Sequence, residues 1–180
     1  AGANHSLGLT AAGSVVAWGE NDYFQCFVPG LNSGFVAVAA GGNHSLALRS
    51  TGEVVAFGRT FENQCSIAQP NSGFVAVSAE HNFSLALRAD GSIAAWGGSL
   101  EQRDVPAPNA DFVAIAAGTR HALGLKTDGS IVAWGSNDTG QLGTGGAYGS
   151  NVPARVSSSE LKTGARFVAV FPEEPTEQPA

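Results

Sequence analysis

Apolar residues recur along the chain in short runs, and Gly, Asp, Asn or Pro separates one run from the next. The runs are rich in β-branched and aromatic residues, which is typical of strands bounded by turns. They are too short and too often interrupted to predict helices. We therefore expect an all-β chain with no helix.

The runs repeat in phase. An aromatic residue ends the third run of each copy, at spacings of 39, 39 and 38 residues: Trp18, Phe57, Trp96 and Trp134. A second run precedes each of them and begins at His5, His44, Phe83 and His121. A first run begins at Phe35, Phe74 and Phe112. Several strands in each repeat of this length are typical of a propeller blade.

Turn signals join the second and third runs of each copy: Ala12-Gly13, Thr51-Gly52, Asp90-Gly91 and Asp128-Gly129. Such pairs favour tight hairpins, so these strands should pair antiparallel. A weaker fourth segment follows the third run, at Gln25 to Pro29, Gln64 to Pro70 and Val105-Pro106. The pattern thus predicts a β-propeller of four-stranded antiparallel blades, with four repeats present.

Both faces of each predicted sheet are apolar. Alternation along a strand places four pairs on common faces: Leu46 with Leu48, Val55 with Phe57, Phe35 with Ala37, and Val36 with Val38. A sheet with two apolar faces must be covered by its neighbours. We therefore expect the indoles of Trp18, Trp96 and Trp134 to be buried between blades.

The repeat motif is Gly-x-x-His-Ser-Leu-Ala-Leu, then Val-Val-Ala-Trp-Gly, then Gln-Cys-x-x-Pro. It resembles the repeat of the regulator of chromosome condensation family over residues 2–170. The resemblance implies a β-propeller, with seven blades in the best-known members. The compact spacing is similar to that of secreted bacterial members, which favours a secreted protein. One departure is Phe83, which stands where the other copies have His.

The repeat also predicts domain bounds. The propeller should span residues 1–170, and the Pro- and Glu-rich residues 171–180 should form an extended tail. The segment 165–170 has the pattern of a first strand and should complete the first blade. The expected blades are 1–34 with 165–170, 35–73, 74–111 and 112–164.

Three architectures fit four repeats. The chain could be part of a larger ring of about seven blades whose N-terminal repeats are missing. Two chains could form one eight-bladed ring as a homodimer, or one chain could close alone with four blades. The absence of Met at position 1 indicates a processed or truncated start.

Composition narrows the partners. The net charge is −6, charged residues make up 13% of the chain, and no basic cluster is present. Nucleic-acid binding requires such a cluster, so no nucleic-acid partner is expected. No apolar run approaches about 18 residues, so no membrane insertion is expected. Cys26 and Cys65 occupy equivalent places in successive repeats, too far apart to form a disulfide.

Histidines at equivalent positions suggest a metal site, but the repeat offers a simpler explanation. His5, His44 and His121 are in phase, and Phe83 interrupts the set. We expect each of them to tie a turn by a hydrogen bond. No metal, cofactor or catalytic residue is predicted, and the chain is not expected to be an enzyme.

The loops after the third strands differ most between copies, and divergent loops on a rigid scaffold are typical of a binding face. The candidate partner-binding residues are Tyr23, Phe24, Phe27, Phe61, Glu62, Arg103 and Tyr148. Phe27 and Phe61 could instead pack under their own loops. The prediction is a non-catalytic scaffold that binds a protein partner. A secreted enzyme inhibitor, a structural module of a larger assembly and a carbohydrate-binding propeller are alternatives.

Overall fold

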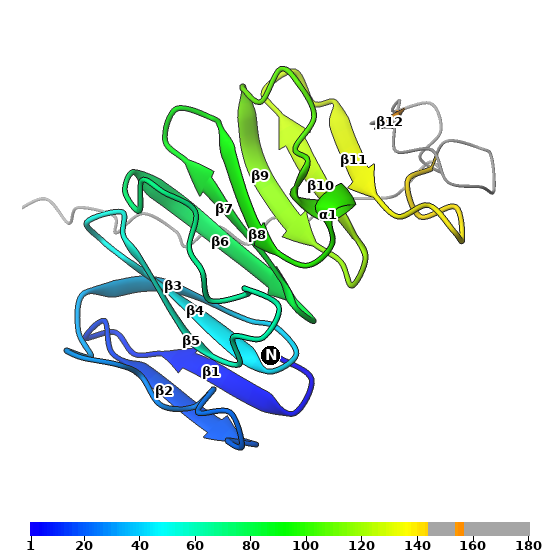
Figure 1. Ribbon diagram of the computed structural model, residues 1–180. Helices are drawn as coiled ribbons and strands as arrows, with labels where there is room; N and C mark the ends of the chain where they lie inside the picture. The colour runs from blue at the N-terminus through cyan, green and yellow to red at the C-terminus, as the bar shows by residue number, and fades with distance from the viewer. Residues whose placement is uncertain (144–153, 157–180) are drawn as a thin grey trace, which may run out of the picture.

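The computed structural model describes residues 1–143 and 154–156, and these form four antiparallel sheets that we number blades 1 to 4 (Figure 1). Blade 1 contains β1 (His5–Leu9) and β2 (Val15–Gly19). Blade 2 contains β3 (Phe35–Ala40), β4 (His44–Arg49) and β5 (Val54–Gly58). Blade 3 contains β6 (Phe74–Glu80), β7 (Phe83–Arg88) and β8 (Ile93–Gly97). Blade 4 contains β9 (Phe112–Ala117), β10 (His121–Lys126), β11 (Ile131–Gly135) and β12 (Ala154–Val156).

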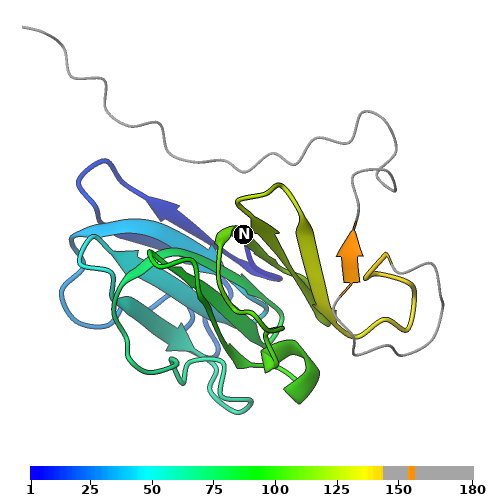
Figure 2. The same ribbon diagram turned by 90° about the horizontal axis from the view of Figure 1, so that it is seen from above.

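The blades stand side by side in chain order (Figures 1 and 2). Apolar side chains fill the space between each pair. The core between blades 1 and 2 includes Val15, Phe35, Ala47 and Phe57. The core between blades 2 and 3 includes Leu46, Leu48, Phe74 and Trp96. The core between blades 3 and 4 includes Phe83, Leu85, Phe112 and Trp134. Burial on both faces explains why the sequence has so few polar positions within strands.

The predicted faces are correct on two strands and wrong on the innermost one. Leu46 and Leu48 lie together against blade 3, while Phe57 and Val55 lie against blade 1. On β3 the pairing register shifts between Phe35 and Ala37. A β-bulge breaks the alternation, so Phe35 faces blade 1 with Val38 while Ala37 faces blade 3.

The predicted hairpins are confirmed. In blade 2, Gly52 has φ 83°, and its N–H donates to the carbonyl of Arg49 at 2.9 Å. A Cβ atom at this position would lie 2.9 Å from the nitrogen of Gly73, in the connection to blade 3. Glycine is needed here for both the left-handed backbone and the close approach.

The predicted fourth strand is wrong in blades 1 to 3, where the described segments form turns and loops. A side chain takes its place. In blade 2 the Oδ1 atom of Asn71 accepts from the Val54 N–H and its Nδ2 donates to the Val54 carbonyl, both at 2.9 Å. Equivalent pairs form between Asn32 and Val15 and between Asn109 and Ile93. In blade 4 the strand β12 pairs with β11, and Val156 lies opposite Ile131.

A short helix, α1 (Leu100–Arg103), contradicts the expectation of no helix. It follows β8 in the loop of blade 3. The Ser99 side chain caps its first turn, and the Gln102 Oε1 atom accepts a hydrogen bond from the Ser99 N–H at 3.0 Å. This capping box stabilises a turn that the apolar pattern could not reveal.

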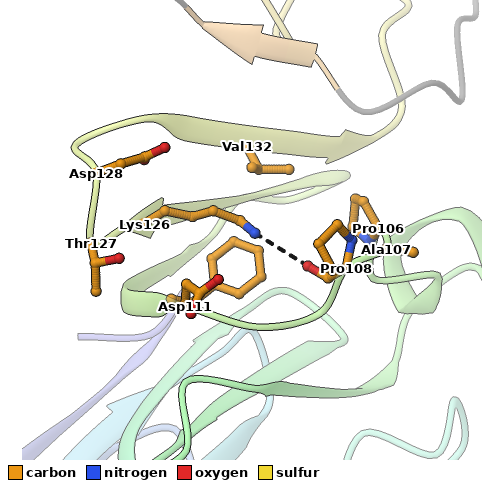
Figure 3. Close-up of a pocket in the computed structure, with 9 residues that line it drawn as sticks. Pro106, Ala107, Pro108, Asp111, Lys126, Thr127, Asp128 and Val132 are labelled. Carbon is orange, nitrogen blue, oxygen red and sulfur yellow. Dashed lines mark hydrogen bonds between the residues drawn. The ribbon is translucent and has the colours of Figure 1, made fainter.

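A cation fastens each connection between blades. The Lys126 ammonium lies 4.6 Å from the Phe112 ring centroid and donates to the Pro108 carbonyl at 3.2 Å (Figure 3). Arg49 and Arg88 lie in the same way over Phe35 and Phe74. A hollow of about 570 Å³ lies beside Lys126. The lysine beside it is already paired with the Phe112 ring and the Pro108 carbonyl.

Two predicted segments, the closing strand at 165–170 and the tail at 171–180, lie outside the described residues. No helix among the described residues is long and apolar enough to cross a membrane.

Candidate partner-binding surface

Two of the repeated histidines, His5 and His44, join neighbouring blades rather than tie turns. The Nε2 atom of His44 lies 2.8 Å from the Ser84 Oγ atom, and the Nε2 atom of His5 lies 2.9 Å from that of Ser45. Where Phe83 replaces His, the next blade has Ala122 in place of Ser, and both are fully buried in one cluster. Polar pairs with polar and apolar with apolar at this position.

Burial sets the chemistry of these histidines. It lowers the pKa of His44 to about 4, assisted by the charges of His5 and His81 and opposed by the His81 carbonyl. The pKa values of His5 and His121 are also lowered, mainly by burial. Neutral imidazoles in fixed bonds suit a structural role. Among residues 1–143 and 154–156, no three His, Cys, Asp or Glu side chains gather where a metal ion could sit.

The tryptophans also link blades, with one exception. The Trp96 Nε1 atom donates to the Gln64 carbonyl at 2.8 Å, and Trp134 Nε1 donates to the Gln102 carbonyl at 2.8 Å. Both indoles are buried, as expected. The expectation is wrong for Trp18, which is 56% exposed. In the described part of the chain, no sheet covers that side of blade 1 (Figure 1).

A glutamine shapes each loop that follows a third strand. The Oε1 atom of Gln25 accepts from the Tyr23 N–H at 2.9 Å, and that of Gln64 accepts from the Glu62 N–H at 2.9 Å. Both glutamines are fully buried beneath their loops. The loops therefore stand on fixed bases, which lowers the entropy that binding would cost.

Aromatic side chains from two blades meet on these loops. The rings of Tyr23 in blade 1 and Phe61 in blade 2 are 6.5 Å apart and nearly perpendicular. The Arg59 guanidinium lies 5.5 Å and 5.4 Å from the two ring centroids, and it pairs with Glu62 at 2.9 Å. Phe61 is nevertheless 77% exposed. We call Tyr23, Arg59, Phe61 and Glu62 the aromatic cluster.

Phe24 extends this surface in a strained conformation. Its φ is 62°, in the left-handed region, and its side chain is 68% exposed. The equivalent residues are Asn63 and Gly140, two types that tolerate this backbone better. A bulky residue held there and turned to solvent suggests a role outside folding.

A shallow groove of about 170 Å³ runs between the loops of blades 1 and 2. It is lined by Asp22, Tyr23, Phe24, Gly58, Arg59, Thr60 and Phe61. Phe27 is also exposed, so the alternative that Phe27 and Phe61 pack under their loops is wrong.

The other candidates lie apart from the aromatic cluster. Arg103, at the end of α1, lines a separate hollow of about 470 Å³ beside the exposed Leu100. Glu62 contributes both to the cluster and to a third hollow of about 310 Å³ towards blade 3. Tyr148 lies outside the described residues.

Sequence reasoning missed Arg59 and Leu100. Arg59 follows Gly58 directly and carries no motif; only its position beside two aromatic rings gives it meaning. Leu100 follows Ser99, and the capping signal at Ser99 is the sequence feature that could have predicted the helical turn that exposes Leu100.

Comparisons with known proteins agree with this architecture. Models described as "Regulator of chromosome condensation (RCC1) repeat" match residues 1–25, 35–65 and 112–141, and residues 128–171. The matches cover more than half of the chain and fall on blades 1, 2 and 4. The protein is thus a propeller built from such repeats. The chain belongs to the regulator of chromosome condensation repeat family, which confirms the family expected from the motif.

Solved structures show the same fold. Yeast RCC1 (Prp20), solved bound to Kap60, is 20% identical with a TM-score of 0.73, over 88% of this chain and 48% of that chain. Human WBSCR16 is 23% identical with a TM-score of 0.69, over 87% of this chain and 50% of that one. The ectodomain of the Arabidopsis thaliana receptor kinase ACR4 is 26% identical with a TM-score of 0.64, over 75% and 49%. The chain spans about half the length of these structures. Curated protein sequences gave no match.

Proposed function

We propose that this chain is a non-catalytic protein-binding propeller whose recognition surface lies on the loops of blades 1 and 2. The observation that carries the proposal is the contact between Tyr23 and Phe61, exposed rings supplied by two neighbouring blades. Tyr and Arg are enriched among residues that dominate protein interfaces, and here both stand on a rigid base. Phe24, Phe27 and Glu62 complete the proposed surface, and Arg103 and Tyr148 would extend it.

The shape of the surface favours a protein over a small ligand. The groove of about 170 Å³ is smaller than typical ligand pockets, which hold roughly 300–1,000 Å³. Exposed aromatic rings around a shallow groove suit a protruding partner side chain. A carbohydrate-binding propeller would repeat its aromatic platform in each blade, but Glu62 and Asn63 stand where blade 1 has Tyr23 and Phe24.

The titratable groups support a non-catalytic role. The groups with the largest pKa shifts are His44 and Cys65, with pKa values of about 4 and about 11. Each is occupied by a structural bond, to the Ser84 hydroxyl and the Arg59 carbonyl respectively. Neither belongs to a group of convergent polar side chains.

Similar propellers are consistent with protein partners. Yeast RCC1 (Prp20) was solved bound to Kap60, and Prp20p has described binding properties to Gsp1p and histones. We transfer from these only the general mode, recognition of a protein by a propeller surface.

The test compares capture of partners from native extract by the wild-type chain and by a Tyr23→Ala, Phe61→Ala double variant. A partner identified with the wild type is then purified and titrated against both. Loss of two anchors should weaken binding by more than about 1 kcal/mol, or roughly five-fold. Leu31→Ala is the control, because Leu31 is about as exposed as Phe61 but lies near Arg49 at the other end of the blades. Equal affinity of the double variant and the wild type would contradict the proposal.

A further inference from the structure

The groove between the loops of blades 1 and 2 holds a cation on one side only. On the blade 2 side, the Arg59 guanidinium lies over the rings of Tyr23 and Phe61. On the blade 1 side, the exposed residues Asp22 and Phe24 line the same groove. Within residues 1–143 and 154–156, no basic side chain lies over the Phe24 ring or pairs with the Asp22 carboxylate.

The exposure of Asp22 and Phe24 belongs to their place in the loop. In the repeat, Asp22 corresponds to Phe61 and Phe24 corresponds to Asn63. Phe61 and Asn63 are also exposed, although blades 1 and 3 flank blade 2 on its two sides. This part of the loop thus projects beyond the sheets, and a flanking blade leaves it accessible.

Arg59 does not make the groove positive, because the chain balances its charge. Its Nη2 atom lies 2.9 Å from the Glu62 Oε1 atom, and the other carboxylate oxygen of Glu62 accepts from Gln64 Nε2 at 3.2 Å. The blade 1 side has the opposite character. Glu20 stands in phase with Arg59, and Asp22 adds a second carboxylate. Because the free face of an aromatic ring is also negative, this side of the groove attracts a cation.

The charge at this end of the blades favours the same kind of partner. Two ion pairs, Arg59 with Glu62 and Arg120 with Asp138, balance themselves. The other Asp, Glu, Lys and Arg side chains of the described loops and turns at this end are one cation, Arg103, and five carboxylates: Glu20, Asp22, Glu80, Glu101 and Asp104. A negative surface of this kind steers a positively charged partner towards the groove.

We propose that the protein partner inserts a basic side chain, arginine or lysine, into the blade 1 side of this groove. The cation lies over the Phe24 ring and pairs with the Asp22 carboxylate. Arg59 already binds in this way on the other side of the groove, over two rings and against a carboxylate. An arginine fits well, because a planar guanidinium can stack on a ring and pair with a carboxylate at the same time. This role rests on the proposed function, to which it adds the chemistry of the partner.

The probe is a short peptide, acetyl-Gly-Gly-Arg-Gly-Gly-amide, compared with the same peptide in which citrulline replaces arginine. Citrulline has nearly the same shape as arginine but no charge. Each peptide is titrated into the isotope-labelled full chain, and the backbone amide shifts are followed by NMR. The arginine peptide should bind roughly five-fold more tightly than the citrulline peptide, with shifts centred on Asp22 and Phe24.

Two variants and a matched control locate the effect. Asp22→Asn should weaken binding of the arginine peptide roughly three-fold and leave the citrulline peptide unchanged. Phe24→Leu keeps an apolar side chain but removes the ring, and it should have a similar effect. Glu53→Gln removes an exposed carboxylate in the turn between β4 and β5, at the other end of the blades, and should keep the wild-type preference. The same spectra show whether each variant folds.

Three peptide results would overturn the inference: equal binding of the two peptides by the wild type, no binding of either, or an unchanged preference in Asp22→Asn. The partner that tests the proposed function gives a second readout. If its affinity falls with Tyr23→Ala, Phe61→Ala but not with Asp22→Asn, the proposed function stands and the basic side chain is refuted. If the double variant keeps full affinity for the partner, the proposed function itself fails.

Discussion

The Nε2 atom of His44 lies 2.8 Å from the Oγ atom of Ser84, and both side chains are completely buried between blades 2 and 3. The Ser84 hydroxyl in turn reaches the Gln64 carbonyl, which also receives the Trp96 N–H. The Gln64 carbonyl, in the loop of blade 2, thus binds two strands of blade 3. Because the His44 ring is completely buried, protonation would place a charge in the interior between the blades.

Folding stability should therefore fall as the pH drops from about 6.5 towards 4. Burial lowers the pKa of folded His44 to about 4 from an ordinary value of 6.5, so the unfolded chain binds the extra proton first. The difference amounts to about 3 kcal/mol of unfolding free energy at pH 7 that is lost by pH 4. Denaturant unfolding curves at several pH values measure it.

Two variants separate this effect from other acid-sensitive groups. His44→Gln should flatten the pH dependence, since the titrating group is gone. Ser84→Ala should lower stability at every pH but keep the dependence, because the buried imidazole remains. If His44→Gln retained the full wild-type pH dependence, another group would be responsible.

Asn71→Ala should destabilise the protein by about 2 kcal/mol. It removes two hydrogen bonds to the main chain of Val54, each worth roughly 1 kcal/mol, and leaves that main chain unpaired. Ser72→Ala, at the exposed neighbouring position, should change the unfolding free energy by less than about 0.5 kcal/mol. Equal effects of Asn71→Ala and Ser72→Ala would show that the Asn71 carboxamide does not stabilise the edge of the sheet at Val54.

Gly52→Ala should cost more stability than Gly129→Ala. Both glycines have positive φ, 83° and 79°, so alanine is strained at either site by about 1–2 kcal/mol. Only at Gly52 would the new Cβ also press on the Gly73 nitrogen, at 2.9 Å, whereas nothing lies within 4 Å at Gly129. Thermal or denaturant unfolding ranks the two variants, and the reverse order would refute the crowding.

Alkylation should modify Cys26 before Cys65. Both thiols are free, and burial raises the pKa of Cys65 to about 11, so little thiolate forms at pH 8. Burial also raises the pKa of Cys26, which is the less enclosed of the two. Mass spectrometry over a time course of iodoacetamide treatment gives the order, and Cys26→Ser identifies the slower site. Faster labelling of Cys65 would contradict it.

The sequence predicted the features that depend on local order. Aromatic residues in phase, glycines after the second strands and apolar alternation on β4 and β5 located the blades and hairpins correctly. These signals succeed because strand period and turn chemistry act over a few residues. The bulge after Phe35 could not be predicted, because an extra residue in one strand does not change the composition of the run.

Features that depend on neighbouring blades were harder to predict. Asn32, Asn71 and Asn109 recur regularly in the sequence. Their hydrogen bonds to the main chains of Val15, Val54 and Ile93 could be recognised only in the structure. The exposure of Trp18 depends on what stands beside blade 1, which a consensus position cannot reveal. The candidate residues Tyr23 and Phe61 were found by type, while their contact and the role of Arg59 required the structure.

The carboxamide bridges make the outer rim of blades 1 to 3 tolerant of change. A single asparagine sets where the chain returns to the third strand, so the loop before it can differ in length and content without moving the sheet. Blade 3 holds a helical turn there, and in blade 4 a strand pairs with β11 instead. Variation can therefore accumulate on this outer rim, while the interior packing stays constant.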